Sequence, residues 1–322
     1  MFVLSIKEIM RILFVLVFAG FFVCNSCNQQ KTDWIDRSKH EGLHNITLSD
    51  KFETYATEVQ PANLENTIKN LELAKAYFDK IFDENLNFAV LFVDNQNWDK
   101  YAFTPPPGMP QAHHEGNIIL GINKSVMANG FEQALSQMPP QATQELKKYF
   151  GEPINLDKFF RDCLALHELG HLYQFYKTSK SSQRNWLNEL FGNLCQVAAA
   201  KSFKNQTTFK QMDSYQNLLI RGNQWGELNY KTLQQFENNY FDVLKSGRNY
   251  GWYQTQFYTM AKELYSKYGD SLVTKFRTFL IDTDVQKLGE LNDVELNEII
   301  KKTFGEDVLS ILKWDYPNSS TD

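Results

Sequence analysis

Cysteine is scarce in this chain of 322 residues, which contains only four. Two of them lie close to the N-terminus, so Cys163 and Cys195 are the only cysteines in the remaining sequence. This count excludes a disulfide-rich scaffold, which replaces a large hydrophobic core with several bridges. We expect Cys163 and Cys195 to be separate buried thiols, and one bridge between them is the alternative.

The chain also lacks a basic segment, and its 33 Lys and Arg residues are outnumbered by 38 Asp and Glu residues. Without a basic patch or stripe, nucleic acid is not an expected partner. Hydrophobic residues make up 43% of the sequence, and a chain of this length can bury a full core. The composition therefore favours a globular protein.

Long hydrophobic runs are absent except at residues 12–23, directly after Arg11. A basic residue followed by about a dozen apolar residues is typical of a secretory signal. The run is too short for a transmembrane helix. We therefore predict a signal peptide over residues 1–26, with Met10 as an alternative start.

The predicted signal ends at Ser26-Cys27, where a small residue precedes a cysteine. This ending resembles a bacterial lipoprotein processing site, and the resemblance implies that Cys27 is lipidated. We then expect an exported protein, anchored to a bacterial membrane on its periplasmic or surface side. An ordinary cleaved signal is the alternative. Residues 27–60 are interpreted as a tether and N-terminal extension.

Hydrophobic spacing predicts regular elements along most of the chain. The predicted elements are, in order, a helix from Pro61 to Ile81, strands at 87–93 and 117–122, a helical stretch over 131–150 interrupted at Pro139-Pro140, a helix over 156–176, a helix over 186–200 and further helices from Thr208 onward. This order indicates an α+β fold that is mainly helical. We divide it into a core with a small sheet, residues 61–206, and a helical C-terminal subdomain, residues 207–322.

The most informative motif is H-E-x-x-H, formed by His167, Glu168 and His171 within the predicted helix over 156–176. Two histidines four residues apart lie on one face of a helix and can bind one zinc ion. The glutamate between them is then the general base that activates zinc-bound water for attack on a carbonyl. With only six histidines in the chain, this spacing indicates a zinc site.

A catalytic zinc ion uses three protein ligands and leaves one position open for water. A metzincin extension would place glycine and histidine three and six residues after His171, but Gln174 and Lys177 stand there. Two sources of a third ligand remain from the residues alone. One is His113 or His114, far upstream, and the other is a glutamate on the next predicted helix.

Trp186-Leu187-Asn188-Glu189 offers such a glutamate. Together with H-E-x-x-H, this segment resembles the gluzincin metallopeptidases, and most closely the aminopeptidase N-like enzymes, over roughly residues 160–280. In that family a W-L-N-E segment follows the histidine motif, and its glutamate is the third zinc ligand. The resemblance implies a zincin-like core in which Glu189 joins His167 and His171 around one zinc ion.

The resemblance implies two further roles after Glu189. Thermolysin-like relatives orient a zinc histidine with a carboxylate four residues after this ligand, where this chain has Asn193. An ordinary polar helix residue is the alternative for Asn193. Aminopeptidase N-like enzymes stabilise the oxyanion with a downstream tyrosine. Tyr253 is the best match, and Tyr250 and Tyr258 compete with it.

One feature of the family is missing. Its aminopeptidases hold the amino terminus of the substrate with a G-x-M-x-N strand, which the nearest segment, residues 115–119, does not match. We therefore expect a zinc-dependent metallopeptidase acting on a peptide or protein substrate, without aminopeptidase specificity. The alternatives are a catalytically inactive zinc-binding lipoprotein that acts as a binding module, and a zinc hydrolase of a non-peptide bond.

Overall fold

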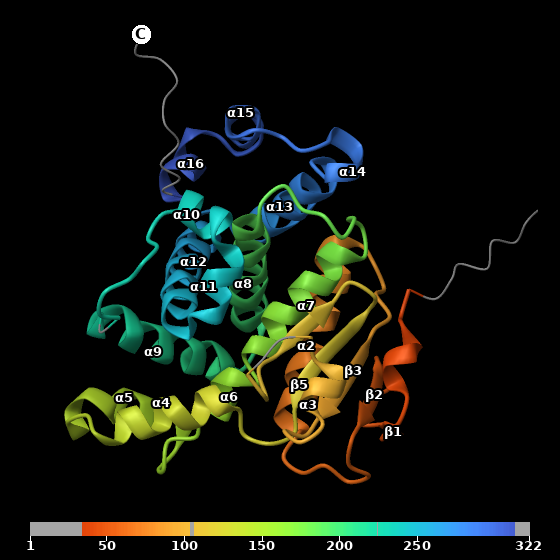
Figure 1. Cartoon of the computed structure of the whole chain (residues 1–322), viewed down its shortest axis with the longest axis vertical. Coiled ribbons are helices and arrows are strands. Elements are labelled where there is room, and N and C mark those ends of the chain that lie inside the picture. The colour runs from red at the N-terminus through yellow and green to blue at the C-terminus, as the bar shows by residue number, and fades with distance from the viewer. Residues whose placement is uncertain (1–33, 104–105, 224, 313–322) are drawn as a thin grey trace, which may run out of the picture. The chain divides into compact units, whose positions relative to one another are not determined.

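The computed structural model describes residues 34–103, 106–223 and 225–312. Strands from these residues form one mixed sheet in the order β1-β2-β3-β5-β4 (Figure 1). β2, β3 and β5 run parallel, and β1 and β4 run antiparallel to their neighbours. The strands are β1 (His44–Asn45), β2 (Glu53–Ala56), β3 (Ala89–Val93), β4 (Gln111–His113) and β5 (Asn117–Gly121).

The two predicted strands lie at the centre of this sheet. Every residue of β3 and β5 is buried, which explains why both runs are almost entirely apolar. The predictions at 87–93 and 117–122 are therefore confirmed. The sequence does not predict β1, β2 or β4, because strands of two to four residues are too short for a clear alternation of polar and apolar positions.

Helices make up most of the described chain, so the fold is α+β and mainly helical, as expected. The helices are η1 (Arg37–His40), α2 (Glu65–Phe82), α3 (Trp98–Tyr101), α4 (Val126–Ser136), α5 (Pro140–Phe150), α6 (Asp157–Phe160), α7 (Leu164–Phe175), α8 (Asn185–Ser202), α9 (Thr207–Gly222), α10 (Leu233–Asn238), α11 (Tyr240–Lys245), α12 (Gly247–Tyr268), α13 (Asp270–Asp282), α14 (Val285–Leu288), α15 (Asp293–Phe304) and α16 (Glu306–Leu312).

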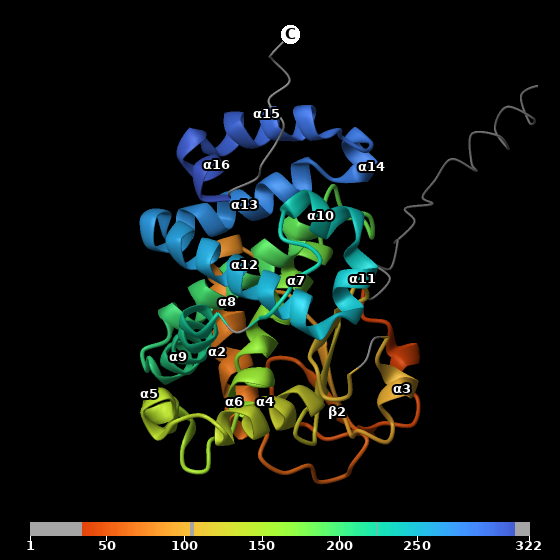
Figure 2. The ribbon, with the colours of Figure 1, turned by 60° about the vertical axis from the view of Figure 1, so that its left-hand side comes forward.

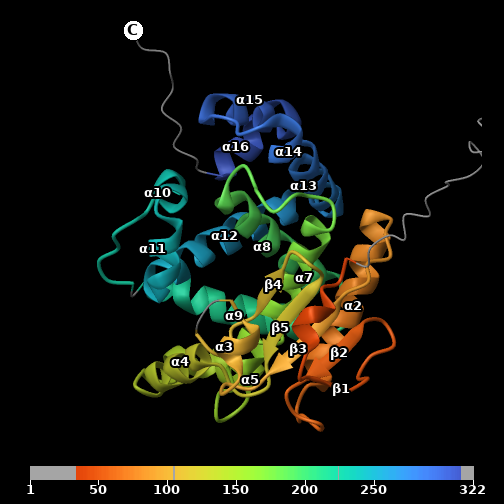
Figure 3. The ribbon, with the colours of Figure 1, turned by 45° about the vertical axis from the view of Figure 1, so that its right-hand side comes forward.

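Helix α7 lies between the sheet and α8. It contacts β4 and β5 on one side and α2 and α8 on the other (Figure 3). The predicted helix from Pro61 to Ile81 corresponds to α2, whose fully buried Leu71, Ala74 and Phe78 recur at three-to-four spacing. The stretch over 131–150 is divided as expected, because Pro140 begins α5.

The prediction of a single helix over 156–176 is wrong, because the structure has two helices, α6 and α7, separated by a turn. The turn brings the side chains of Arg161 and Asp162 into the interior. Arg161 donates to the carbonyls of Ile122 (3.2 Å) and Asn63 (3.0 Å), and Asp162 accepts from Thr67 (2.5 Å). A buried charged side chain needs such partners, and one continuous helix pattern cannot reveal them.

The C-terminal helices share their packing with the core helices. α12 packs along α8, and α13 contacts α2, α7 and α8. Figure 2 shows α13, α15 and α16 stacked beyond α12. The described residues of 61–206 and 207–322 lie within one compact unit that begins at Ile35, so the division into two subdomains stays a prediction.

Two expectations about cysteine and the N-terminus have different outcomes. Cys163 and Cys195 are both buried free thiols, which confirms the preferred prediction over the bridge. The predicted signal over 1–26 and the lipidated Cys27 lie outside the described residues. Among the residues that the structure describes, none of the helices has the length and apolarity needed to cross a membrane.

Candidate metal centre

The two histidines of H-E-x-x-H face the same point from one side of α7. Their Nε2 atoms lie 2.9 Å apart, and both rings are buried, at 6% and 7% exposure. The ring of His171 stacks on Phe175 with an interplanar angle of 7°. One turn of helix therefore brings His167 and His171 together, as their spacing predicts.

Glu189 approaches this pair from α8. Its Oε2 atom lies 3.5 Å from Nε2 of His167, and one ligand atom from each of the three residues lies within 4.8 Å of the others. Ligand atoms of a tetrahedral zinc ion, bound at about 2.0–2.2 Å, are separated by roughly 3.4 Å. Two buried imidazoles and one buried carboxylate therefore fit a zinc ion in chemistry, and two of their separations, 2.9 Å and 3.5 Å, lie near this value.

Two glycines allow α7 and α8 to cross closely at this point. A Cβ atom on Gly192 would lie 2.6 Å from Nε2 of His167, and one on Gly170 would lie 2.5 Å from Cβ of Cys195. Each helix thus leaves out a side chain where the other helix needs the space. The close crossing brings Glu189 within reach of the histidines.

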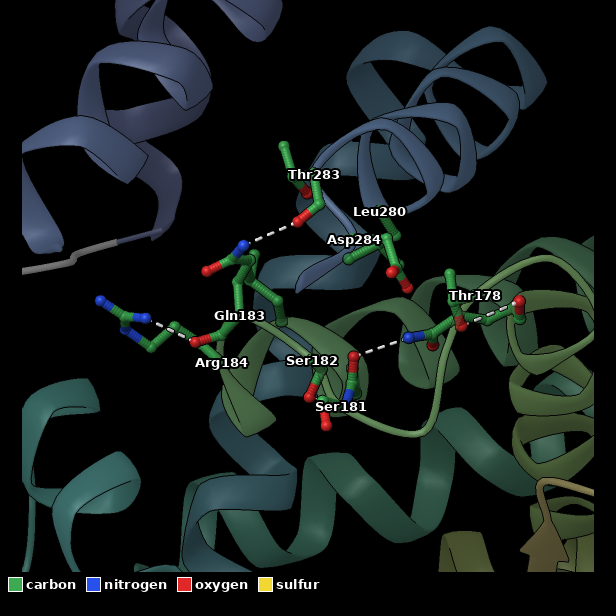
Figure 4. A pocket seen from close by; sticks show the side chains of 11 residues that line it. Thr178, Ser181, Ser182, Gln183, Arg184, Leu280, Thr283 and Asp284 are labelled. Atoms are coloured by element: carbon green, nitrogen blue, oxygen red, sulfur yellow. Dashed lines mark hydrogen bonds between the residues drawn. The ribbon is translucent and has the colours of Figure 1, made fainter. Parts of the chain in front are cut away.

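The loop between α7 and α8 is fixed to the C-terminal helices (Figure 4). The Gln183 carboxamide donates to the carbonyls of Thr283 (2.8 Å) and Gly289 (2.7 Å). The backbone N–H of Ser179 donates to the carboxylate of Asp284 (2.6 Å). These bonds hold the connection between the two ligand-bearing helices in one conformation.

Side chains from α11 and α12 hold the carboxylate of Glu189 in place. Gln254 donates to Oε2 at 2.7 Å and Tyr250 donates to the same oxygen at 3.2 Å. Tyr240 donates to Oε1 at 3.4 Å. The sequence alone does not indicate Tyr240 or Gln254 as site residues. Gln254 carries a usable signal, because it lies one helical turn after Tyr250.

The structure places Asn193 in a different role from the one expected. Its amide donates to the Glu189 carbonyl (2.9 Å) and to Oε1 of Gln254 (2.8 Å). Asn193 therefore orients Gln254, which in turn binds the Glu189 carboxylate. Both bonds use the N–H groups of the amide, and the expected contact of its carbonyl oxygen with an imidazole of the motif stays a prediction.

The hydroxyl of Tyr253, the expected oxyanion donor, has its partner outside the ligand group. Its hydroxyl donates to the carbonyl of Thr232 (2.8 Å), and its ring packs against Phe236. Tyr250 instead lines a cavity together with His167 and Glu168. The competing tyrosine, Tyr250, therefore replaces Tyr253 as the residue that faces the site.

His113 and His114 are not part of the ligand group formed by the described residues. The ring of His114 stacks on Phe175 with centroids 3.8 Å apart, and His113 packs edge-on against Phe103. Burial lowers the pKa of His113 to about 4. Both histidines therefore serve as packing groups beside the site.

The two glutamates of the site have opposite pKa shifts. Burial raises the pKa of Glu168 to about 7. Burial also tends to raise the pKa of Glu189, but its hydrogen bond to His167 and the histidine charges hold it at about 2. Burial lowers the pKa of His171 to about 3. Glu189 is thus a permanent carboxylate, and Glu168 exchanges its proton near neutral pH.

The known proteins give no further guidance on this site. No protein-family model, curated protein or solved structure matches the chain.

Proposed function

We propose that this protein is a zinc-dependent hydrolase of peptide bonds, with a zincin-like core and a gluzincin type of ligand set. The observation that carries the proposal is the convergence of His167, His171 and Glu189, all buried, beside Glu168 at the wall of a cavity of about 220 Å³. Of the three ligands, His167 lines this cavity, and three protein ligands with a fourth position left open are typical of catalytic rather than structural zinc sites.

A bound zinc ion would lower the pKa of water and polarise the substrate carbonyl. Glu168 then accepts a proton from the attacking water and passes it to the leaving amine. Its pKa of about 7, raised by burial, suits a group that both accepts and donates a proton at neutral pH. Tyr250, whose hydroxyl donates to Oε2 of Glu189 in the structure, would turn this one hydrogen to the oxyanion of the tetrahedral intermediate.

The substrate backbone binds along β4. This strand is the last in the sheet, and it lies against α7, where the backbone of Ala112 hydrogen-bonds Glu168. An extended peptide that pairs with such an edge strand presents successive carbonyls next to the reactive groups. Aminopeptidase specificity is not part of the proposal, because the G-x-M-x-N strand is missing.

The place of action in this proposal is outside the cytoplasm. It rests on the signal pattern over 1–26 and on Cys27 as the lipid-bearing residue. A lipid anchor would hold the hydrolase at a bacterial membrane on its periplasmic or surface side. Labelling with palmitate tests this part separately. We expect wild type to be exported and labelled, and Cys27→Ser to lose the label.

Glu168→Gln tests the proposed chemistry. We expect the variant to keep about one zinc ion per chain and to lose at least about 10³-fold in kcat on a mixture of unstructured peptides. Zinc content is measured by mass spectrometry and hydrolysis by release of new amino termini. Wild-type kcat should rise with pH as Glu168 loses its proton, because only the carboxylate form accepts a proton.

Equal hydrolysis by wild type and Glu168→Gln would contradict the proposal. Zinc binding without cleavage of any peptide by wild type would also contradict it, and would favour a binding protein instead.

A further inference from the structure

The cavity beside Glu168 is lined mainly by aromatic and aliphatic side chains. It reaches from the reactive residues of α7 to α4, α6, α9 and α12. Its aromatic lining residues, Tyr250 apart, are Phe131, Phe159, Phe160, Tyr215 and Trp225. Aromatic walls favour an aromatic guest, because ring pairs gain free energy beyond the burial of their area.

The lining carries almost no charge. Apart from Glu168 and His167, which belong to the reactive site, it contains no Asp, Glu, Lys, Arg or His among the described residues. A charged substrate group in this cavity would lose its hydration without gaining a partner. The guest is therefore uncharged.

One polar group in the lining has no hydrogen-bond partner. Gln216 of α9 is only 5% exposed, and its Oε1 atom is an unpaired buried acceptor among the described residues. The other amides of the lining are engaged, since Asn193 binds Gln254, Gln254 binds Glu189, and Gln196 donates to the Cys163 carbonyl. A buried acceptor without a partner is costly, and a substrate donor would remove that cost.

We propose that this cavity binds a tyrosine side chain next to the scissile bond, and that Gln216 is the residue that selects it. The inference rests on the proposed peptidase function. The tyrosine ring packs on the aromatic lining, and its hydroxyl donates to Oε1 of Gln216, whose side chain lines the cavity and turns toward the guest to bring this buried oxygen within reach. A phenol is neutral at pH 7 and can both donate and accept, so it suits a carboxamide partner.

Paired peptide substrates test this inference. A peptide that wild type cleaves is made in two forms, with tyrosine or phenylalanine next to the scissile bond. We expect wild type to prefer tyrosine by about 10-fold or more in kcat/KM, because phenylalanine leaves the acceptor unpaired. Gln216→Leu should lower this ratio to about one or invert it.

Gln211→Leu is the matched control. Gln211 is a buried glutamine of the same helix, but its amide donates to the Tyr149 carbonyl (2.9 Å) and it does not line the cavity. Its variant should keep the wild-type tyrosine preference. A wild-type ratio near one, or an unchanged ratio in Gln216→Leu, would overturn the inference.

Binding to zinc-loaded Glu168→Gln separates this inference from the proposed function. N-acetyl-tyrosinamide and N-acetyl-phenylalaninamide are titrated by calorimetry into this variant, with and without Gln216→Leu. A tyrosinamide preference that depends on Gln216 would support the inference even if no peptide is cleaved. Equal binding of the two amides would overturn it even if wild type is an active peptidase.

Discussion

At the scale of residues, the site divides its two carboxylates between two roles. Glu189 lies against His167 and accepts from Gln254 and Tyr250, which keeps it ionised and suited to binding a cation. Glu168 lies next to His167 in the mostly apolar wall of the cavity. Burial there raises its pKa to about 7. Carboxylates whose surroundings separate their pKa values in this way can act as ligand and as proton carrier.

Tyr250 and Tyr253 give a matched pair of variants, because of the two only Tyr250 lines the cavity. Tyr250→Phe removes the hydroxyl that faces the cavity, so we expect kcat on peptides to fall about 10²-fold while zinc is retained. Tyr253→Phe removes only the bond to the Thr232 carbonyl. It should leave kcat within about threefold and cost about 1 kcal/mol in the free energy of unfolding.

Steady-state kinetics and thermal unfolding check both expectations. The assignment of Tyr250 is contradicted when Tyr253→Phe shows the larger loss in kcat.

The sequence predicts the ligands of the site better than their neighbours. His167 and His171 lie on one helix, so their spacing alone determines that they meet. Which tyrosine of α12 faces the site depends on the rotation of that helix against α8. Tyr250 and Gln254 lie one turn apart and both reach Glu189, whereas Tyr253 lies about 60° around the helix from Tyr250. The packing of α12 against α8 determines this rotation, and no local sequence motif predicts it.

At the scale of elements, the site depends on how closely α7 and α8 approach. His167 occupies the space that a side chain at position 192 would need, and Cys195 occupies the space above Gly170. The short distance between the helix axes follows from these missing side chains. The loop fixed by Gln183 then limits how far the two helices can slide.

Gly192→Ala tests the close crossing. Its Cβ atom would overlap the His167 ring at 2.6 Å, so we expect the ring to move and the zinc affinity to fall by about 10- to 100-fold. The affinity is measured by competition with a chelating dye.

Gly130→Ala is the control for this substitution. Gly130 lies inside α4, and a Cβ atom there meets nothing within 4 Å. It should leave zinc affinity unchanged and raise the free energy of unfolding by about 0.5–1 kcal/mol. Equal zinc affinity in both alanine variants would contradict the packing argument.

The local pattern of apolar residues predicts the elements whose buried residues recur at regular spacing, such as α2, β3 and β5. It misses β4, because only three residues form it and their side chains alternate poorly. It also joins α6 to α7, because the turn between them is stabilised by distant carbonyls of Asn63 and Ile122. Long-range hydrogen bonds of this kind are not visible in a periodic pattern.

At the scale of the whole molecule, the site forms where distant parts of the chain meet. β4 and α7 supply one wall of the cavity, α4 and α9 a second, and α12 a third. Helices of the predicted C-terminal subdomain thus hold Glu189 and line the cavity. Residues 167–193 contain all three proposed ligands, but the walls of the cavity come from the complete fold.

The zinc content of the purified protein tests the central claim most directly. After dialysis against metal-free buffer, mass spectrometry should find about one zinc ion per wild-type chain. Glu189→Ala should lose most of this zinc, whereas Glu298→Ala, an exposed glutamate of α15, should keep it. Wild type without zinc, or Glu189→Ala with a full equivalent, would contradict a metal centre formed by His167, His171 and Glu189.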